Sequence, residues 1–382
     1  MKLLRCFIII SSLLFSTMSV SAKDLTPNTE SSILIESSTG KILYGKNVDK
    51  KLAPASMTKM MTILITIESI DNGKITYKDK VRISKKAASM GGSQIFMAEN
   101  DVFTVKELLK AICIASANDA SVAIAEYIGG TEDNFVKMMN ARAKKLGLKN
   151  TMFKNPHGLD DNGHLTTARD LSIIAKELVK HEEILKITGT YESYIYRPNK
   201  EKFWLVNTNK LIRVYNGMDG LKTGFTDNAG YSLTATAKKN DMRLISVVMK
   251  SKTSESRSTD TINLLEYGFN LYNTKTIINK NKKVGQINIS NSKKGVYPYY
   301  VEEDVKDIKK KGSSFKKVKY KKELYKIEAP IKKKQMIGKL YFNNRSYNLI
   351  TNKAIKKANY FENLLNNFKK IISGNVYLKG LS

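Results

Sequence analysis

Hydrophobic and polar positions divide this chain into a central part that mixes helices with strands and a C-terminal part of short strands. Residues 56–70 are apolar nearly all round, which is typical of a helix buried within a core. Strand-like segments at 32–36 and 41–44 flank a polar turn and predict a hairpin. Apolar positions at helical spacing predict further helices over 105–128, 134–145, 171–179, 183–187 and 260–268.

The later half of the central part is typical of strands. Segments of strand-like composition lie at 203–206, 218–223, 231–237 and 243–249. A hairpin, then helices, then strands is the order of an α+β fold, in which a helical cluster packs on an antiparallel sheet. We therefore expect one α+β domain over residues 24–275.

The pattern changes near residue 276. Short alternating segments predict a small all-β domain over residues 276–354, with strands at 284–289, 296–301, 315–319, 335–341 and 346–350. Residues 355–378 predict an amphipathic helix, because one helical face collects Phe361, Leu364, Leu365, Phe368, Ile371 and Ile372. Lysines flank that face, which predicts a helix lying in an anionic membrane interface. The alternative is a helix packed on the β domain.

The N-terminus predicts export. Residues 1–22 begin with Lys2 and Arg5, continue with an apolar segment and end in small residues at Ala22, as secretory signals do. The apolar segment is short for a membrane-spanning helix of about 20 residues. An uncleaved N-terminal anchor is the alternative. Cys6 lies in this segment, so Cys113 is the lone thiol of the mature chain, and its apolar surroundings predict a buried structural role.

The amino-acid composition limits the kinds of partner and of functional site that the chain can have. The 382 residues have a formal net charge of +30, and residues 276–382 hold 26 Lys and Arg against 7 Asp and Glu. A basic C-terminal third predicts an anionic partner, either lipid, an acidic polymer or nucleic acid, or else a solvated lysine-rich face. Export argues against nucleic acid. With three histidines, two cysteines and no HExxH motif, the sequence indicates neither a metal site nor a cofactor.

Ser56 and Lys59 form the first candidate pair. They lie three residues apart at the start of the apolar helix, so their side chains are neighbours on its surface. A serine hydroxyl is a weak nucleophile and needs a base, and a lysine can act as one when burial lowers its pKa. At the start of a helix, the backbone N–H of Ser56 can face a developing oxyanion.

Two more motifs follow. Ser116 and Asn118 come after a buried segment, where they form a cap or turn, or else supply a proton relay and a hydrogen bond to an acyl group. Lys222, Thr223 and Gly224 end a predicted strand, where a cation and a hydroxyl suit a carboxylate and a glycine permits close backbone approach. Strict strand alternation does not bring Lys222 and Thr223 into one pocket.

The three motifs together are more specific than any one of them. S-x-x-K at Ser56, S-x-N at Ser116 and K-T-G at Lys222 match the motif set of penicillin-binding proteins and class A β-lactamases, with Ala117 in place of the lactamase Asp. The chain resembles serine-type D-alanyl-D-alanine carboxypeptidases, the low-molecular-weight penicillin-binding proteins of peptidase family S11, over about residues 34–269. The resemblance implies their β-lactamase-like domain and extends to the β domain and amphipathic C-terminus of membrane-attached members.

The resemblance also implies a mechanism. Ser56 would attack the D-Ala–D-Ala carbonyl of a peptidoglycan stem pentapeptide with Lys59 as the base, and water would hydrolyse the acyl-enzyme. Phe225, where family members often carry His, would complete the oxyanion hole through its N–H. Arg257 would join Lys222 in binding the terminal carboxylate. β-Lactam antibiotics would acylate the same serine as substrate mimics, at the outer face of a bacterial cytoplasmic membrane.

His157 and His164 match family positions as well. Hydrogen bonding within a loop is the simpler role for both. The resemblance implies no metal and no cofactor.

Other functions stay open. A β-lactamase shares the fold and motifs, but class A enzymes use a glutamate-directed water, and none of the glutamates from 126 to 192 has Asn four residues later. A D,D-endopeptidase that cuts cross-links has the same motifs, although such enzymes commonly lack the β domain. A non-enzymatic, cationic wall-binding module would carry a degenerate site, whereas all three motifs are intact.

Overall fold

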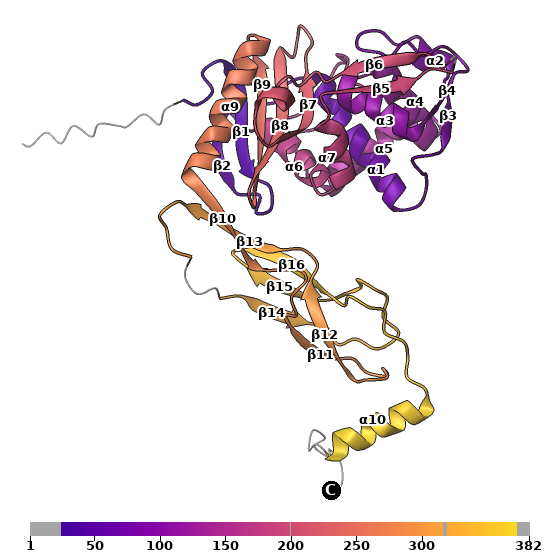
Figure 1. Cartoon of the computed structure of the whole chain (residues 1–382), viewed down its shortest axis with the longest axis vertical. Coiled ribbons are helices and arrows are strands. Elements are labelled where there is room, and N and C mark those ends of the chain that lie inside the picture. Colours follow the sequence, from indigo (N-terminus) through magenta and orange to yellow (C-terminus); the bar gives the residue numbers. More distant parts are fainter. Residues whose placement is uncertain (1–23, 199, 316–318, 373–382) are drawn as a thin grey trace, which may run out of the picture.

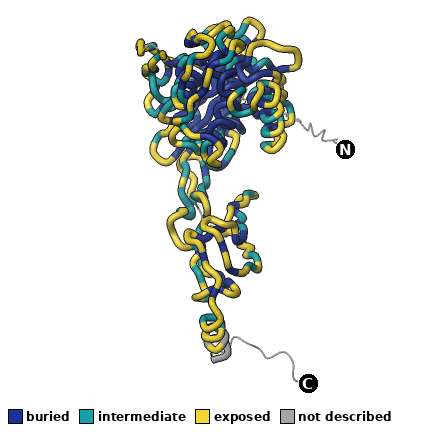
Figure 2. The backbone as a smooth tube through the Cα atoms, turned by 90° about the vertical axis from the view of Figure 1, so that its right-hand side faces the viewer, coloured by how far each residue is buried: buried dark blue, intermediate teal, exposed yellow. Residues whose placement is uncertain are grey.

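The computed structural model describes residues 24–198, 200–315 and 319–372. A large α+β unit comprises β1 to α9, a smaller all-β unit comprises β10 to β16, and helix α10 lies at the far end (Figure 1). Buried residues concentrate in the large unit and form a thinner core in the β unit (Figure 2). The predicted α+β fold class is confirmed. The predicted secretory signal over 1–22 lies outside the described residues.

A five-stranded antiparallel sheet forms the centre of the large unit, in the order β2-β1-β9-β8-β7. Its strands are β1 Thr29–Glu36, β2 Ile42–Lys46, β7 Met218–Gly224, β8 Tyr231–Lys239 and β9 Met242–Ser251. Both faces of this sheet are covered. Ile33 and Ile35 of β1 pack in the helical core, whereas Leu34 between them packs with Leu264 of α9 (Ser254–Leu271). Successive side chains of one strand therefore pack into two different hydrophobic cores.

Helices cover the other face of the sheet. α1 (Lys59–Asp71) is buried along almost its whole length, as its apolar composition predicts. The residues before it form a 3-10 turn, η1 (Ala55–Thr58), so the α-helix predicted from residue 56 begins three residues later. Other helices of this unit are α2 Lys85–Ala88, α5 Glu132–Lys145, α6 Ala168–Leu178, α7 Glu182–Thr188 and α8 Leu211–Val214.

The continuous helix predicted over 105–128 is wrong at its centre. α3 (Val105–Lys110) runs into a π-helical segment, η2 (Ala111–Ala115), and α4 (Asn118–Gly129) begins after a break. Ser116 at the break has a left-handed backbone, with φ 64° and ψ 30°. Apolar periodicity does not record such a break, and π-helical segments are frequent at functional sites.

Two small hairpins flank the helical part. β3 (Lys80–Arg82) pairs with β4 (Val102–Thr104), and β5 (Glu192–Tyr196) pairs with β6 (Lys202–Val206). The sequence predicts β6 but not β5. The reason is that β6 is apolar at four of its five positions, whereas β5 begins with Glu192 and Ser193 and carries a weaker apolar signal.

The all-β unit begins directly after α9. β10 (Tyr272–Ile278) starts four residues before the predicted boundary at 276 and pairs with β13 (Val305–Lys310). The sequence predicts neither strand, because lysines and polar residues fill most of their positions. A second sheet has the order β11-β12-β16-β15-β14. Its strands are β11 Gly285–Asn288, β12 Val296–Val301, β14 Lys321–Leu324, β15 Met336–Phe342 and β16 Arg345–Ile350. The strand predicted at 315–319 lies largely outside the described residues.

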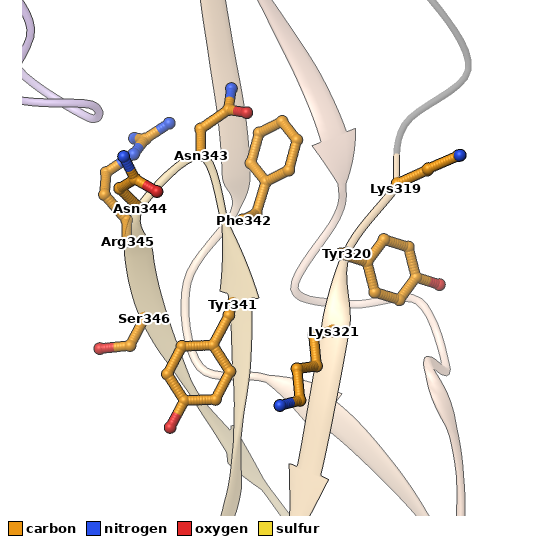
Figure 3. Close-up of a pocket in the computed structure, with 9 residues that line it drawn as sticks. All are labelled: Lys319, Tyr320, Lys321, Tyr341, Phe342, Asn343, Asn344, Arg345 and Ser346. Carbon is orange, nitrogen blue, oxygen red and sulfur yellow. The ribbon is translucent and has the colours of Figure 1, made fainter.

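The β unit has a pocket of its own, beside β14 at the turn between β15 and β16. Figure 3 shows Tyr320 and Lys321 on one side of it and the hairpin residues from Tyr341 to Ser346 on the other. None of the residues that line this pocket is a predicted catalytic or substrate-binding residue. The pocket is therefore separate from the candidate active site.

α10 (Tyr360–Ile372) extends beyond the β unit (Figure 1). Its apolar side chains at Phe361, Leu364, Leu365 and Phe368 are all exposed, from 43% at Leu364 to 73% at Phe361. Lys293 of the β unit forms an ion pair with Glu362 at 2.8 Å. Within the part of the chain that the structure describes, no helix has the length and apolarity needed to cross a membrane.

Candidate active site

Ser56 and Lys59 meet as the sequence predicts. Lys59 Nζ lies 2.9 Å from Ser56 Oγ. The turn that carries Ser56 is 3-10, and in that geometry residues i and i+3 eclipse each other, which brings the two side chains to the same side. The pair lies where η1 passes into α1, against the edge strand β7.

Lys59 is fully buried, and its amine has two further partners. Nζ lies 2.7 Å from Asn118 Oδ1 and 2.6 Å from the carbonyl oxygen of His157. Burial lowers the pKa of Lys59 well below 10.5, and the nearby charge of Lys222 lowers it further. Loss of solvation is costly for an ammonium ion, so the buried amine loses its proton more easily than an exposed lysine does.

All three partners of Lys59 Nζ are oxygen atoms. The Asn118 and His157 oxygens can only accept hydrogen bonds, and a neutral amine has two N–H groups to donate to them. The protonated amine donates to Ser56 Oγ as well, and loss of that proton leaves the nitrogen lone pair facing the serine hydroxyl. The amine is thus placed to accept the serine proton, which is what a general base must do.

Both the oxygen and the nitrogen of the Asn118 side-chain amide form hydrogen bonds within the protein. Besides accepting from Lys59, it donates from Nδ2 to the Gly91 carbonyl at 2.7 Å, and its backbone N–H donates to the Ser93 carbonyl at 2.6 Å. Asn118 therefore positions the Lys59 amine and joins α4 to the loop around residues 91–93. Its predicted contact with a substrate acyl group remains a prediction.

Ser116 lies two residues before Asn118 and is 2% exposed. Its position at a left-handed turn agrees with the turn interpretation of the motif. Among the described residues, the hydrogen bonds of Lys59 Nζ run to Ser56, Asn118 and His157, and none joins it to Ser116. The proton relay through Ser116 is thus untested.

Lys222 and Thr223 lie in one buried cluster, although they are neighbours on β7. The Lys222 side chain folds back, so that Nζ donates to the Thr223 carbonyl at 3.0 Å and lies 3.5 Å from Thr223 Oγ1. Thr223 Oγ1 in turn donates to Thr208 Oγ1 at 2.7 Å. Neighbouring side chains on a strand point to opposite faces of the sheet. The lysine side chain is long and flexible enough for its Nζ to reach Thr223 all the same.

The cluster is positively charged. Burial lowers the pKa of Lys222 to about 7, and the positive charge of Arg257 adds to this effect. Arg257, at the start of α9, is 5% exposed, and its pKa is also lowered by burial. Its Nε has no hydrogen-bond partner among the described residues. Buried cations with unfilled donors suit an anion such as a carboxylate.

Gly224 packs beside the turn that carries Ser56, and Phe225 follows it in the chain. A Cβ at Gly224 would lie 2.9 Å from the Pro54 carbonyl oxygen, so the close approach of β7 to the turn before Ser56 requires glycine. Phe225 is 49% exposed, and its ring lies 4.3 Å from the ring of Tyr231, measured between centroids. The oxyanion role of its backbone N–H remains a prediction.

Both loop histidines make local hydrogen bonds. His157 Nδ1 accepts from the Leu159 N–H at 3.2 Å, and His164 Nε2 lies 2.9 Å from Thr58 Oγ1. Burial lowers the pKa of His157 to about 3 and that of His164 to about 4, so both rings are neutral near pH 7.

The His157 carbonyl is a site group that the sequence does not reveal. Any residue type supplies a carbonyl, so no side-chain pattern marks it. The one available signal is the next residue, Gly158, whose φ is +89° and whose Cβ would overlap the Ala55 carbonyl oxygen. Only glycine lets this loop approach η1 closely enough to reach Lys59.

A serine next to a buried lysine of lowered pKa, with a cationic anion site on the adjacent edge strand, defines a serine acyl-transfer enzyme of the penicillin-binding kind. A family model described as D-alanyl-D-alanine carboxypeptidase, peptidase S11, matches residues 17–253. The chain belongs to this family, and its activity is that of a serine-type D-alanyl-D-alanine carboxypeptidase.

Individual relatives agree with this assignment. The chain is 49% identical over 318 residues to D-alanyl-D-alanine carboxypeptidase DacF of Bacillus subtilis, covering 83% of this chain and 82% of the relative. Penicillin-binding protein 5 of Haemophilus influenzae matches with a TM-score of 0.68 at 33% identity, covering 86% of this chain and 98% of the other. Penicillin-binding protein D2 of Listeria monocytogenes, in an ampicillin-bound form, matches with a TM-score of 0.58 at 32% identity, covering 64% and 99%.

Proposed function

We propose that Ser56 is the nucleophile and Lys59 the general base of this carboxypeptidase. Ser56 Oγ attacks the carbonyl carbon of the D-Ala–D-Ala bond while its proton passes to Lys59 Nζ. The proton then reaches the departing amine through Ser116, and free D-alanine leaves. Water, activated by the same amine, hydrolyses the ester on Ser56 and restores the serine.

The remaining site residues bind the substrate. The backbone N–H groups of Ser56 and Phe225 receive the oxyanion, and Asn118 contacts the acyl side. Lys222, with Thr223, Gly224 and Arg257 around it, binds the terminal carboxylate of the stem pentapeptide, which supplies the anion that the buried cations lack. β-Lactam antibiotics occupy the same pocket as this substrate, and the ampicillin-bound form of the Listeria relative supports β-lactam binding.

The chain acts at the outer face of the cytoplasmic membrane. The predicted signal at 1–22 supports export, and cleavage leaves residues 24–275 as the catalytic domain, followed by the β domain at 276–354. The helical segment 355–378 attaches the protein to anionic lipid through its exposed apolar face. Its partner outside the cell is peptidoglycan, and nucleic acid is not one.

The observation that carries this proposal is the 2.9 Å separation of Lys59 Nζ and Ser56 Oγ in a site that lowers the lysine pKa. Fluorescent penicillin tests it directly. We expect Ser56→Ala to abolish covalent labelling and to lower D-alanine release from a pentapeptide by about 10³-fold or more.

Ser69→Ala is the matched control, because Ser69 lies on α1 and donates to the Ile65 carbonyl within that helix. It keeps labelling and D-alanine release. Labelling of Ser56→Ala at the wild-type rate would contradict the proposal. Loss of the label within seconds would indicate a β-lactamase instead, since the carboxypeptidase acyl-enzyme with penicillin should last for minutes.

A further inference from the structure

The outer face of the β5–β6 hairpin is unusually aromatic for an exposed surface. Tyr194, Tyr196 and Trp204 point outward and are 50%, 53% and 56% exposed. Tyr194 and Trp204 are direct cross-strand partners, and Lys202 Nζ lies 5.7 Å from the Tyr194 ring centroid. The outward face of a hairpin that covers a core is ordinarily polar, so this cluster, called the aromatic platform below, indicates a binding surface.

The platform is held rigidly from below. Ile195 and Leu205, on the inner face of the same strands, are buried in the helical core. Glu192 accepts a hydrogen bond from Trp204 Nε1 at 3.2 Å, which orients the indole. A preorganised aromatic surface loses little side-chain entropy when a ligand binds.

The hairpin leads directly into the active site. The Asn207 N–H donates to the Tyr191 carbonyl across its base, and Thr208 follows, whose hydroxyl accepts from Thr223 at 2.7 Å. At its other end, the Arg197 guanidinium donates to the Ile95 carbonyl at 3.4 Å, in the loop that Asn118 holds. The platform is therefore continuous with the substrate site.

The distances suit the polymer that carries the stem peptide. Trp204 lies four residues before Thr208, which is at most about 13 Å along a strand. The bond to be cut lies four residues from the sugar of the glycan strand, or about 14 Å of extended peptide. A substrate with its terminal carboxylate near Lys222 thus has its sugars within reach of the hairpin.

We propose that the aromatic platform binds the glycan strand of peptidoglycan, beside the stem peptide held in the active site. Pyranose rings have an apolar C–H face and a rim of polar groups. Flat tyrosine and tryptophan rings cover the apolar face, while the Tyr OH groups and Lys202 remain available to the rim. This inference rests on the proposed function, because the glycan arrives attached to the stem peptide.

A membrane is a poorer partner for the same rings. Figure 1 places β5 and β6 at the opposite end of the molecule from α10, which carries the exposed apolar face proposed to lie in the membrane. A chain attached through α10 holds the hairpin away from the lipid surface. The wall polymer is the ligand present on that side.

The chain has a single tryptophan, so its fluorescence reports Trp204 alone. We would titrate the full Ser56→Ala chain with linear glycan strands of alternating N-acetylglucosamine and N-acetylmuramic acid from which an amidase has removed the peptides. We expect a saturable change in tryptophan fluorescence. Tyr194→Ala should weaken the binding by about 2–10-fold, the value of one aromatic contact.

Tyr320→Ala, an exposed tyrosine of the β unit, is the matched control and leaves the titration unchanged. A titration without a saturable change, or with no effect of Tyr194→Ala, overturns the proposal. A change in fluorescence with protein concentration, in the absence of glycan, would show that a second copy of the chain covers the platform, and it overturns the proposal equally.

A kinetic comparison gives a second readout. We would measure kcat/KM for glycan-linked stem peptides and for free pentapeptide and take the ratio of the two values. Trp204→Ala should lower this ratio by about 2–10-fold, because it raises KM for the glycan-linked substrate. An unchanged ratio contradicts the proposal that the platform binds glycan.

Penicillin labelling distinguishes failure of the proposed function from failure of this inference. An unlabelled wild-type chain refutes the proposed function, whereas a labelled chain without glycan binding refutes only glycan binding by the platform.

Discussion

At the scale of single residues, the proposed mechanism depends on two buried lysines, one neutral and one positively charged. Lys59 has to be neutral to accept the Ser56 proton, and Lys222 has to be charged to bind a carboxylate. Burial lowers the pKa of both, well below 10.5 for Lys59 and to about 7 for Lys222. The positive charge of Lys222 lowers the pKa of Lys59 further, and that of Arg257 lowers the pKa of Lys222.

This arrangement predicts a bell-shaped pH dependence of kcat/KM for D-alanine release. The rate should rise with pH as Lys59 loses its proton, and fall by about tenfold per pH unit above about pH 7 as Lys222 loses its own. Lys222→Arg retains a cation that does not titrate, so the alkaline fall should move to higher pH.

Lys176→Arg is the control for that experiment. Burial lowers the pKa of Lys176 too, but it lies on α6 at the side of Glu36 and Arg243, away from Ser56. Its substitution should leave the profile in place. An alkaline fall that stays at pH 7 in Lys222→Arg would show that another group is responsible.

At the scale of elements, the site is a meeting point of four chain segments that approach one another closely. η1 brings Ser56, the break after η2 brings Asn118, β7 brings Lys222, and the loop at 155–159 brings the His157 carbonyl. The approach of this loop depends on Gly158, with φ +89° and no room for a Cβ beside Ala55.

Gly158→Ala should therefore lower both stability and acylation. Overpacking against backbone costs about 1–3 kcal/mol, which corresponds to a fall in Tm of about 2–4 °C per kcal/mol in a domain of this size. The rate of penicillin acylation should fall as well, because displacement of His157 removes one acceptor from Lys59. Both are measured by thermal unfolding and labelling kinetics.

Gly73→Ala is a control for the backbone strain alone. Gly73 also has a positive φ, +70°, but a Cβ there meets nothing within 4 Å. It should lower Tm slightly and leave acylation unchanged. If Gly158→Ala behaves in the same way as Gly73→Ala, the loop does not position Lys59.

At the scale of the whole molecule, the unit that carries Ser56 and the helix α10 lie at opposite ends (Figure 1). α10 lies beyond the β unit, with exposed rings at Phe361 and Phe368. A chain that ends at Asn359 should move from the membrane fraction to the soluble fraction and still be labelled by penicillin at Ser56. Sedimentation with anionic and with neutral lipid vesicles measures the difference.

Substitution of Leu364 and Leu365 by serine is a milder variant with the same expected release. Both side chains are exposed in the structure, so their substitution leaves the core intact. Equal sedimentation of the truncated and full chains with anionic vesicles would assign attachment to the lysine-rich β unit instead.

The sequence by itself determined the chemical groups and most of the elements that carry them. Ser56 and Lys59 are three residues apart, and a buried apolar helix follows them, so local geometry alone brings them together. The main sheet and the buried helix were predictable because their apolar periodicity is strong. Weakly apolar strands such as β5 and β10 were not.

Only the tertiary structure decided how these groups combine. The left-handed break at Ser116, the Lys222 side chain folded back on Thr223, and the His157 carbonyl on Lys59 all depend on contacts between segments far apart in the chain. Burial that lowers a lysine pKa is likewise a property of the packed molecule, since a lysine in an isolated segment stays solvated.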